Sequence, residues 1–210
     1  MPVSYETLFA FILASFVLLV IPGPTIIMVV GQALAHGRRV AFASVAGVGL
    51  GDLAAASLSI IGVGTILAAS ATVFLVIKWV GAAYLIYIGI KMWMTPVSIP
   101  DVNSLPATGS RRTVLRDSFL VTLLNPKGLV FFMAFVPQFI DPRDAFAPQA
   151  ALFVVVFVLL GVLNAWGYAM LASSARYVIR QPSVLRAATR TGACFLIGAG
   201  LFSAFARRAT

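Results

Sequence analysis

The stretch Ile21-Pro22-Gly23-Pro24-Thr25 interrupts the first long apolar run of the chain. Residues 8–35 carry no charge and are long enough to cross a bilayer, which needs about 20 apolar residues. Both prolines lack a backbone N–H and clash with the preceding turn, and Gly23 adds backbone freedom, so the stretch predicts a broken helix. Because broken backbone in hydrocarbon is tolerated only where it is buried in protein or lines a watery cavity, we ask what this break faces.

Composition indicates a protein with several membrane spans. Of its 210 residues, 61% are apolar and 10% are charged, whereas a soluble domain is roughly 45–50% apolar. The net charge of +9 does not indicate a nucleic-acid partner, because the basic residues lie between apolar runs rather than in a patch beside aromatics. Cys194 stands alone, which argues against a disulfide or a redox pair. The first run is too long for a cleaved signal peptide, so we expect it to be retained.

Apolar runs separated by charged or proline-rich turns predict six transmembrane helices. They cover roughly residues 5–34, 40–68, 73–94, 114–140, 146–174 and 187–206. Residues 95–113 are rich in proline and serine and end in Arg111-Arg112, which indicates a linker between two halves. We therefore expect an all-α membrane protein with one integral membrane domain, built from a three-helix repeat over 1–94, a cytoplasmic linker over 95–113 and a second three-helix repeat over 114–210.

Basic residues are unequally shared between the two ends of these spans. The loops after the first, third and fifth spans hold ten of the fifteen, namely Arg38, Arg39, Lys91, Arg111, Arg112, Arg116, Arg176, Arg180, Arg186 and Arg190. The opposite side holds Arg143, Arg207 and Arg208, while Lys78 and Lys127 lie within spans. Positively charged loops stay in the cytoplasm, so both termini are predicted outside.

A second break occurs at the corresponding place in the second half. Asn125-Pro126-Lys127-Gly128 interrupts the fourth span as Pro22-Gly23-Pro24 interrupts the first, and Pro22 and Pro126 are 104 residues apart. Since each half has three spans, the second half enters the membrane from the opposite face, which makes an inverted repeat. Paired Pro/Gly interruptions of this kind point to the central site of a transporter.

Each break also has the chemistry of a helix start. Gly23-Pro24 and Asn125-Pro126 read as an N-cap followed by proline at the first helical position, which would leave free N–H groups and a positive dipole end inside the membrane. Such an end attracts a carboxylate, and the carbonyls freed before the break could accept from an ammonium group. The candidate substrate-binding residues are Pro22, Gly23, Pro24, Asn125, Pro126, Lys127 and Gly128. The alternative is two simple proline kinks.

Two charges lie deep within predicted spans. Asp52 ends the glycine-rich run Gly47-Val48-Gly49-Leu50-Gly51, and Lys127 follows the second break. A charge at the bilayer centre costs at least about 2.5–3.5 kcal/mol, so both should face the interior or a cavity. In one hypothesis Asp52 exchanges protons, and Lys127 attracts a substrate carboxylate or alternates as the partner of Asp52. In the other, the two form a fixed ion pair between spans two and four.

Other polar or small residues in the spans are more simply explained by packing or by the membrane interface. Gly47 and Gly51, four residues apart, permit close helix approach. Single polar side chains could line a path, although satisfied core contacts explain them equally; these are Tyr84, Tyr87, Gln138 and Asn164. His36 is expected at the cytoplasmic interface. No His, Cys or carboxylate cluster has metal-ligand spacing, so neither a metal nor another cofactor is predicted.

Five motifs in order along residues 21–139 resemble the LysE/RhtB family of amino-acid exporters. They are Pro22-Gly23-Pro24, the glycine-rich run ending in Asp52, Lys78-Trp79-Val80-Gly81-Ala82-Ala83-Tyr84-Leu85, Asn125-Pro126-Lys127-Gly128 and Phe135-Val136-Pro137-Gln138-Phe139. Length and hydropathy fit that family over the whole chain, whereas beyond residue 145 the resemblance rests on them alone. The resemblance is greater to the homoserine, threonine and neutral amino-acid branch than to the lysine branch.

The resemblance implies a bacterial inner-membrane exporter of amino acids or related metabolites, driven by proton influx. Combined with the breaks, it predicts alternating access, with the amino acid bound between the two breaks and Asp52 protonated from outside. The chain is then a transporter rather than an enzyme, and a homo-oligomer is compatible with the sequence. A passive channel or a lipid-handling protein on the same broken-helix fold is the alternative.

Overall fold

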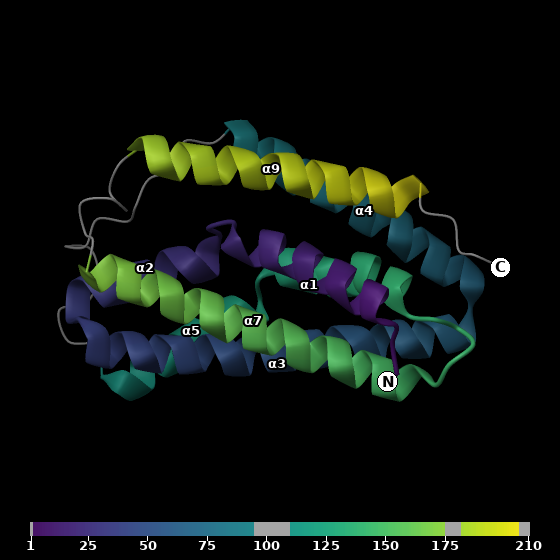
Figure 1. Cartoon of the computed structure of the whole chain (residues 1–210), viewed down its shortest axis with the longest axis horizontal. Coiled ribbons are helices and arrows are strands. Elements are labelled where there is room, and N and C mark those ends of the chain that lie inside the picture. Colours follow the sequence, from purple (N-terminus) through teal and green to yellow (C-terminus); the bar gives the residue numbers. More distant parts are fainter. Residues whose placement is uncertain (1, 95–109, 175–181, 206–210) are drawn as a thin grey trace.

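A computed structural model describes residues 2–94, 110–174 and 182–205 of the chain (Figure 1). The described residues form helices and contain no β-strand. The predicted linker lies mostly outside them, at residues 95–109. In chain order the elements are α1 (Tyr5–Val20), α2 (Pro24–His36), α3 (Arg38–Ala69), α4 (Ala71–Met94), α5 (Arg111–Leu123), α6 (Pro126–Val130), the π-helix η2 (Phe131–Phe135), the 3-10 helix η3 (Val136–Phe139), α7 (Phe146–Ser174) and α9 (Pro182–Phe205).

Both proline-containing stretches separate two helices that point in different directions. The bend is 56° between α1 and α2, and 41° between α5 and the segment Pro126–Phe139. Proline occupies a first-turn position of α2 and of α6, where its missing N–H costs no intrahelical bond. The chain therefore stops one helix and starts another at each of the two predicted sites.

Up to four membrane spans can be assigned in the described residues by length and hydropathy. Val40–Thr65 within α3 and Phe146–Ala172 within α7 qualify as single helices, and the two bent pairs qualify together. The helices α4 and α9 have 24 residues each and pack along each other. At about 1.5 Å per residue each is long enough to cross the hydrocarbon core. The full six-helix inverted repeat stays a prediction.

The first helix of each half begins with the same cap. Ser4 accepts a hydrogen bond from the N–H of Thr7, and Ser110 accepts one from the N–H of Thr113, both at 3.2 Å. A serine that satisfies an orphan N–H in the first turn stabilises the start of a helix. The matching caps and the matching breaks agree with a repeat, although the second half carries the π-helix η2 where α2 is regular.

The glycines of α3 let α5 approach closely. A Cβ at Gly47 would collide with the backbone of Leu115, and one at Gly51 would lie 2.7 Å from the Cβ of Thr122. A buried hydrogen bond of 2.7 Å between the Ser44 and Ser118 hydroxyls joins the same two helices. The interpretation of Gly47 and Gly51 as packing residues is therefore confirmed.

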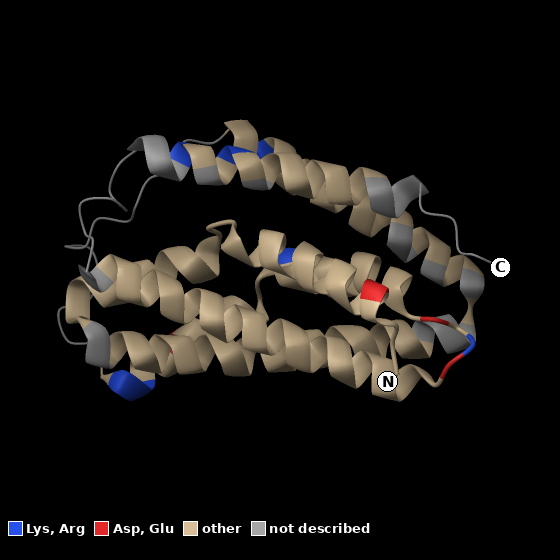
Figure 2. Ribbon diagram, viewed as in Figure 1, with Lys and Arg blue, Asp and Glu red and all other residues tan. Residues whose placement is uncertain are grey.

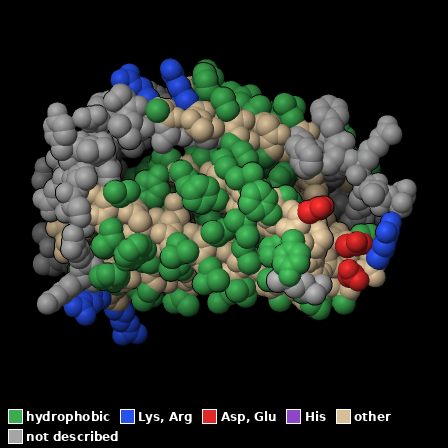
Figure 3. Space-filling model, viewed as in Figure 1, with side chains coloured by type: hydrophobic (Ala, Val, Ile, Leu, Met, Phe, Trp, Pro, Cys, Tyr) green, Lys and Arg blue, Asp and Glu red, His purple; other side chains and the backbone are tan. Residues whose placement is uncertain are grey.

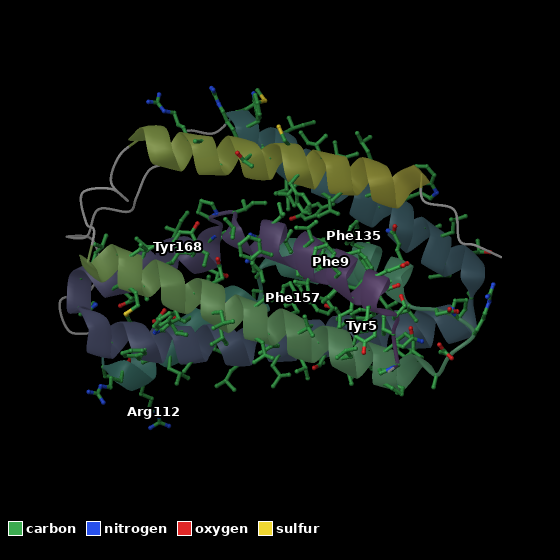
Figure 4. The ribbon with its side chains drawn as sticks, in the orientation of Figure 1. Tyr5, Phe9, Arg112, Phe135, Phe157 and Tyr168 are labelled. Carbon is green, nitrogen blue, oxygen red and sulfur yellow. The ribbon has the colours of Figure 1, made fainter. Side chains whose placement is uncertain are left out.

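An aromatic cluster packs α1 against η2 and α7. Phe11 lies with its ring centroid 4.5 Å from that of Phe153 and 6.2 Å from that of Phe131. Phe157 contacts Phe131 and Phe132 at centroid distances of 5.7 and 4.8 Å. All five rings are buried. Figure 4 shows Phe157 on α7 near α1, with Tyr168 farther along α7 towards α2. The cluster therefore holds α1 against the segment that follows the second break.

Charge and apolar surface are separated along the bundle. Apart from the buried Asp52 and Lys127, charged residues lie mainly towards its two ends, with acidic residues mainly at the end that holds the start of α1 (Figure 2). Between the ends the visible flank is covered by hydrophobic side chains (Figure 3). Large apolar side chains that are exposed in the bundle include Leu58, Ile61, Val155 and Leu159. The start of α1 and the end of α9 lie at the same end of the bundle (Figure 1). This distribution is that of a bundle immersed in lipid.

Candidate functional site

The two breaks meet in the interior. The side-chain amide of Asn125 donates to the hydroxyl oxygen of Thr25 over 3.1 Å, and the Thr122 hydroxyl lies 3.4 Å from the same oxygen. The side-chain oxygen of Asn125 also accepts from the N–H of Lys127, as its N-cap position requires. Pro22 is buried. The two breaks therefore face each other in the interior, an arrangement that an amino acid bound between them would require.

Four consecutive carbonyls at the end of α1 accept from side chains rather than from backbone. The Lys127 ammonium donates to the Leu18 and Ile21 oxygens, both at 2.9 Å. The Asn164 amide donates to Leu19 at 2.9 Å, and the Tyr168 hydroxyl donates to Val20 at 2.7 Å. The last carbonyls of a helix lack intrahelical partners, so these three side chains complete the end of α1.

The start of α2 is less fully satisfied. Its N-cap, Gly23, has no side chain to accept a bond, and proline follows it. The N–H groups of Thr25 and Ile26 lie in the first turn, where no intrahelical acceptor exists. Both residues line the cavity described below. The positive end of the α2 dipole therefore opens on that cavity.

Asp52 faces the break from α3. It is 9% exposed, and its carboxylate lies against the backbone of Gly161 on α7, so that a Cβ at Gly161 would collide with one carboxylate oxygen. Lys127 is 8% exposed. No ion pair joins the two, since the ion pair found in the described residues is Arg116–Asp117 at the surface. The hypothesis of a fixed Asp52–Lys127 pair therefore does not describe this conformation.

A small cavity brings these groups together. Its volume is about 30 Å³, enough for about two water molecules. The polar lining comes from both breaks and from α3 and α7, and the apolar lining from the same helices and α1. The lining residues are Leu18, Leu19, Gly23, Thr25, Ile26, Val48, Asp52, Asn125, Lys127, Gly128, Phe157, Gly161 and Asn164.

The structure divides the predicted site residues into two groups. Gly23, Asn125, Lys127, Gly128 and Asp52 line the cavity. The three prolines are not part of this lining; Pro22 is buried, whereas Pro24 and Pro126 are exposed. Pro24 and Pro126 begin α2 and α6, and they shape the breaks although their rings do not line the cavity. The carbonyls expected to receive a substrate ammonium are already bonded to Lys127, Asn164 and Tyr168.

The other polar residues of the spans were expected either to line a path or to make core contacts, and the structure shows examples of both. Asn164 lines the cavity. Gln138 donates to the carbonyl of Ala134 one turn earlier, and Tyr84 packs on Tyr87 with ring centroids 6.1 Å apart. Neither Gln138 nor the two tyrosines line this cavity. Within the described residues, no group of three His, Cys, Asp or Glu side chains could hold a metal ion.

Sequence reasoning missed two contributors on α7. Gly161, which contacts Asp52, and Tyr168, which bonds Val20, were not singled out. With Asn164 they are spaced by three and four residues, which places all three on one face of a helix. The sequence did contain a signal for these residues, because a glycine and two polar residues share one face of an otherwise apolar span.

Replacing Gly161 by alanine is expected to reduce the transport that the sequence resemblance implies, without preventing folding. The added Cβ would displace the Asp52 carboxylate from its place against α7. Gly167→Ala is the matched control on the same helix, because a Cβ there meets no atom within 4 Å. Amino-acid transport, the activity that the sequence resemblance implies, is measured for the two purified variants, with their thermal stability in parallel. Equal transport by both would show that the position of Asp52 is not constrained by Gly161.

These features define a class of protein: a helical membrane protein whose small polar cavity lies between two broken helices. Residues 16–207 match the LysE type translocator family, so the chain belongs to that family. It is 35% identical over 203 residues to the homoserine/homoserine lactone efflux protein of Salmonella typhi, covering 96% of this chain and 98% of the relative.

Two further relatives are similar over shorter or comparable lengths. The leucine efflux protein of Klebsiella pneumoniae is 30% identical over 146 residues, which are 70% of this chain and 68% of the relative. An uncharacterized membrane protein of Vibrio cholerae is 30% identical over 198 residues, 94% of this chain and 96% of the relative. No solved structure matches the chain.

Proposed function

We propose that this protein exports an amino acid or a closely related metabolite from the cytoplasm by proton antiport. The observation that carries the proposal is the cavity between the two breaks, which places a cation, a carboxylate and an uncapped helix start around one small volume. A zwitterion offers complementary groups to all three. Membership of the translocator family and the names of the efflux relatives support the export part of this proposal.

The substrate carboxylate binds at the start of α2. The N–H groups of Thr25 and Ile26 point along the positive end of the helix dipole, which favours an anion. Lys127, which lines the same cavity, can add a charge-assisted bond, because an ammonium has three N–H donors and needs only one of them for the substrate carboxylate. The apolar wall formed by Ile26, Val48 and Phe157 then accommodates an uncharged substrate side chain.

The names of the relatives narrow the substrate class. Homoserine and leucine are zwitterions, whereas the ring of homoserine lactone leaves no free carboxylate. The α-ammonium is the charged group common to all three. We therefore propose a substrate that carries an α-ammonium group and a small, uncharged side chain.

Transport proceeds by alternating access. The cavity has room for about two water molecules, which is too little for an amino acid, so the two bent helix pairs must move apart before substrate enters. Asp52 takes up a proton from the outside, and its neutral form favours return to the inward-facing state. We place six spans in the inner membrane of a bacterium with both termini in the periplasm, because the described basic residues concentrate at the opposite end of the bundle (Figure 2).

Efflux from preloaded cells tests this proposal. Cells with the protein should release a labelled amino acid faster than cells without it, in a panel that includes homoserine, leucine and threonine. Release against the substrate gradient, abolished by a protonophore, is expected for an antiporter. Flux that only follows the substrate gradient would identify a passive channel, and unchanged efflux across the panel would contradict export.

A further inference from the structure

We propose that the Leu18 and Ile21 carbonyls form the subsite for the substrate ammonium and that Lys127 occupies this subsite when substrate is absent. The inference rests on the proposed export function for the identity of the substrate. In this scheme Lys127 is a tethered cation that the α-ammonium of the amino acid displaces. The subsite itself is a separate claim about cation binding and can be tested without transport.

The two carbonyls converge on one point. Both lie 2.9 Å from the Lys127 ammonium nitrogen, although that residue is more than one hundred positions away in the chain. They converge because α1 ends there, where Ile21 adopts an extended conformation with φ −67° and ψ 117°. Carbonyls at the end of a helix carry the negative end of its dipole, which stabilises a cation. The end of α1 is therefore built as a cation site.

The neighbouring carbonyls are held differently. Leu19 and Val20 accept from Asn164 and Tyr168, which are uncharged and lie on one face of α7. Asparagine and tyrosine have few rotatable bonds, so these two bonds hold the end of α1 in place. Lysine instead carries its ammonium on a flexible four-carbon stem. The pair Leu18 and Ile21 is thus the part of the cluster whose donor can leave while the backbone stays fixed.

A second acceptor for the displaced lysine lies in the same cavity. Asp52 lines it together with Lys127, yet forms no ion pair with it in this conformation. When a substrate ammonium takes the two carbonyls, Lys127 moves to the Asp52 carboxylate. Two buried cations do not then compete for the same carbonyls, and neither charge is left unpaired, which would be costly in a site of low dielectric.

This exchange predicts which ligands the protein accepts. A ligand must present a compact cation with N–H donors, since the carbonyls are hydrogen-bond acceptors. A carboxylic acid with a hydroxyl in place of the amine should not displace Lys127. A quaternary ammonium, which has the charge and no N–H, should not either.

Removing the tether tests the subsite directly. In purified Lys127→Ala the carbonyl pair is vacant, and methylammonium supplies the missing group. We expect methylammonium at about ten times its Kd to raise the Tm of Lys127→Ala by about 3–5 °C. Tetramethylammonium should leave that Tm unchanged. The wild-type protein and Lys91→Ala, which removes an exposed lysine of α4, should respond to neither.

The outcomes separate this inference from the proposed function. Equal Tm responses of wild type and Lys127→Ala to methylammonium would overturn the ammonium subsite and leave amino-acid export standing. A methylammonium-specific response in a protein that exports no amino acid would support the cation site and overturn export. If Lys127→Ala does not fold, Lys127→Met keeps most of the side-chain volume, and the ammonium ion serves as the smaller probe with the same expected contrast.

Discussion

Lys127→Met is expected to lower amino-acid efflux at least tenfold and to destabilise the protein. The ammonium makes two charge-assisted hydrogen bonds to backbone carbonyls, at 2.9 Å each, and lies in the cavity where substrate is proposed to bind. The proposed charge-assisted bond from Lys127 to the substrate carboxylate contributes about 1.5–3 kcal/mol, and 1.4 kcal/mol is a factor of ten in binding. Methionine has a similar length and no donor.

The stability cost has a separate origin. Without Lys127, the Leu18 and Ile21 carbonyls lose their donor, and an unsatisfied buried polar group costs roughly 1–3 kcal/mol. The variant also no longer pays the desolvation penalty of a buried cation, which offsets part of this loss of stability. We therefore expect a net loss of about 1–3 kcal/mol in the free energy of unfolding, measured by denaturation in detergent.

Lys91→Met is the matched control, because Lys91 is exposed in the last turn of α4. It should leave both efflux and stability near the wild-type values. Wild-type efflux by Lys127→Met would remove Lys127 from the binding site. Unchanged stability would show that water or another side chain replaces it on the two carbonyls.

The position of both breaks could be predicted because the cause is local. Proline and glycine restrict or loosen the backbone at their own positions, so Pro22-Gly23-Pro24 and Asn125-Pro126 reveal the breaks without any knowledge of packing. The burial of Asp52 and Lys127 followed from the cost of a charge in hydrocarbon, which applies wherever the two residues lie. The packing role of Gly47 and Gly51 followed from their spacing.

The partners of these groups could not be predicted, because they depend on which helices become neighbours. Asn164 and Tyr168 bond carbonyls 145 and 148 residues earlier in the chain. No local rule relates α7 to the end of α1. For the same reason, Lys127 was expected to interact with a carboxylate, whereas the nearest acceptors in space are the carbonyls of Leu18 and Ile21.

The prolines determine where the site lies, but they do not line it. Pro24 and Pro126 were included among the binding residues because they mark the breaks, yet both are exposed. What they create is the pair of helix starts, whose N–H groups and caps face inwards through Thr25, Ile26 and Asn125. A motif in the sequence identifies the backbone geometry, and the neighbouring residues carry the chemistry.

Asp52→Asn is expected to uncouple efflux from the proton gradient. Asparagine has nearly the same shape as aspartate and should fit the same place against Gly161, but it cannot take up or release a proton. In proteoliposomes with the membrane potential held at zero, a gradient of one pH unit supports at most about a tenfold substrate accumulation for exchange of one proton per molecule. The wild-type protein should approach this limit, whereas Asp52→Asn should show no accumulation beyond equal concentrations.

The control for this variant is Asp117→Asn on α5. Asp117 is paired with Arg116 at the surface, with 38% of its side chain exposed, and it should leave accumulation unchanged. Exchange of labelled for unlabelled substrate, which needs no net proton movement, distinguishes lost coupling from lost binding. If Asp52→Asn retains exchange but not accumulation, Asp52 carries the proton. If Asp52→Asn accumulates substrate as the wild type does, another residue couples transport to protons. Asp52 then only contributes negative charge to the cavity.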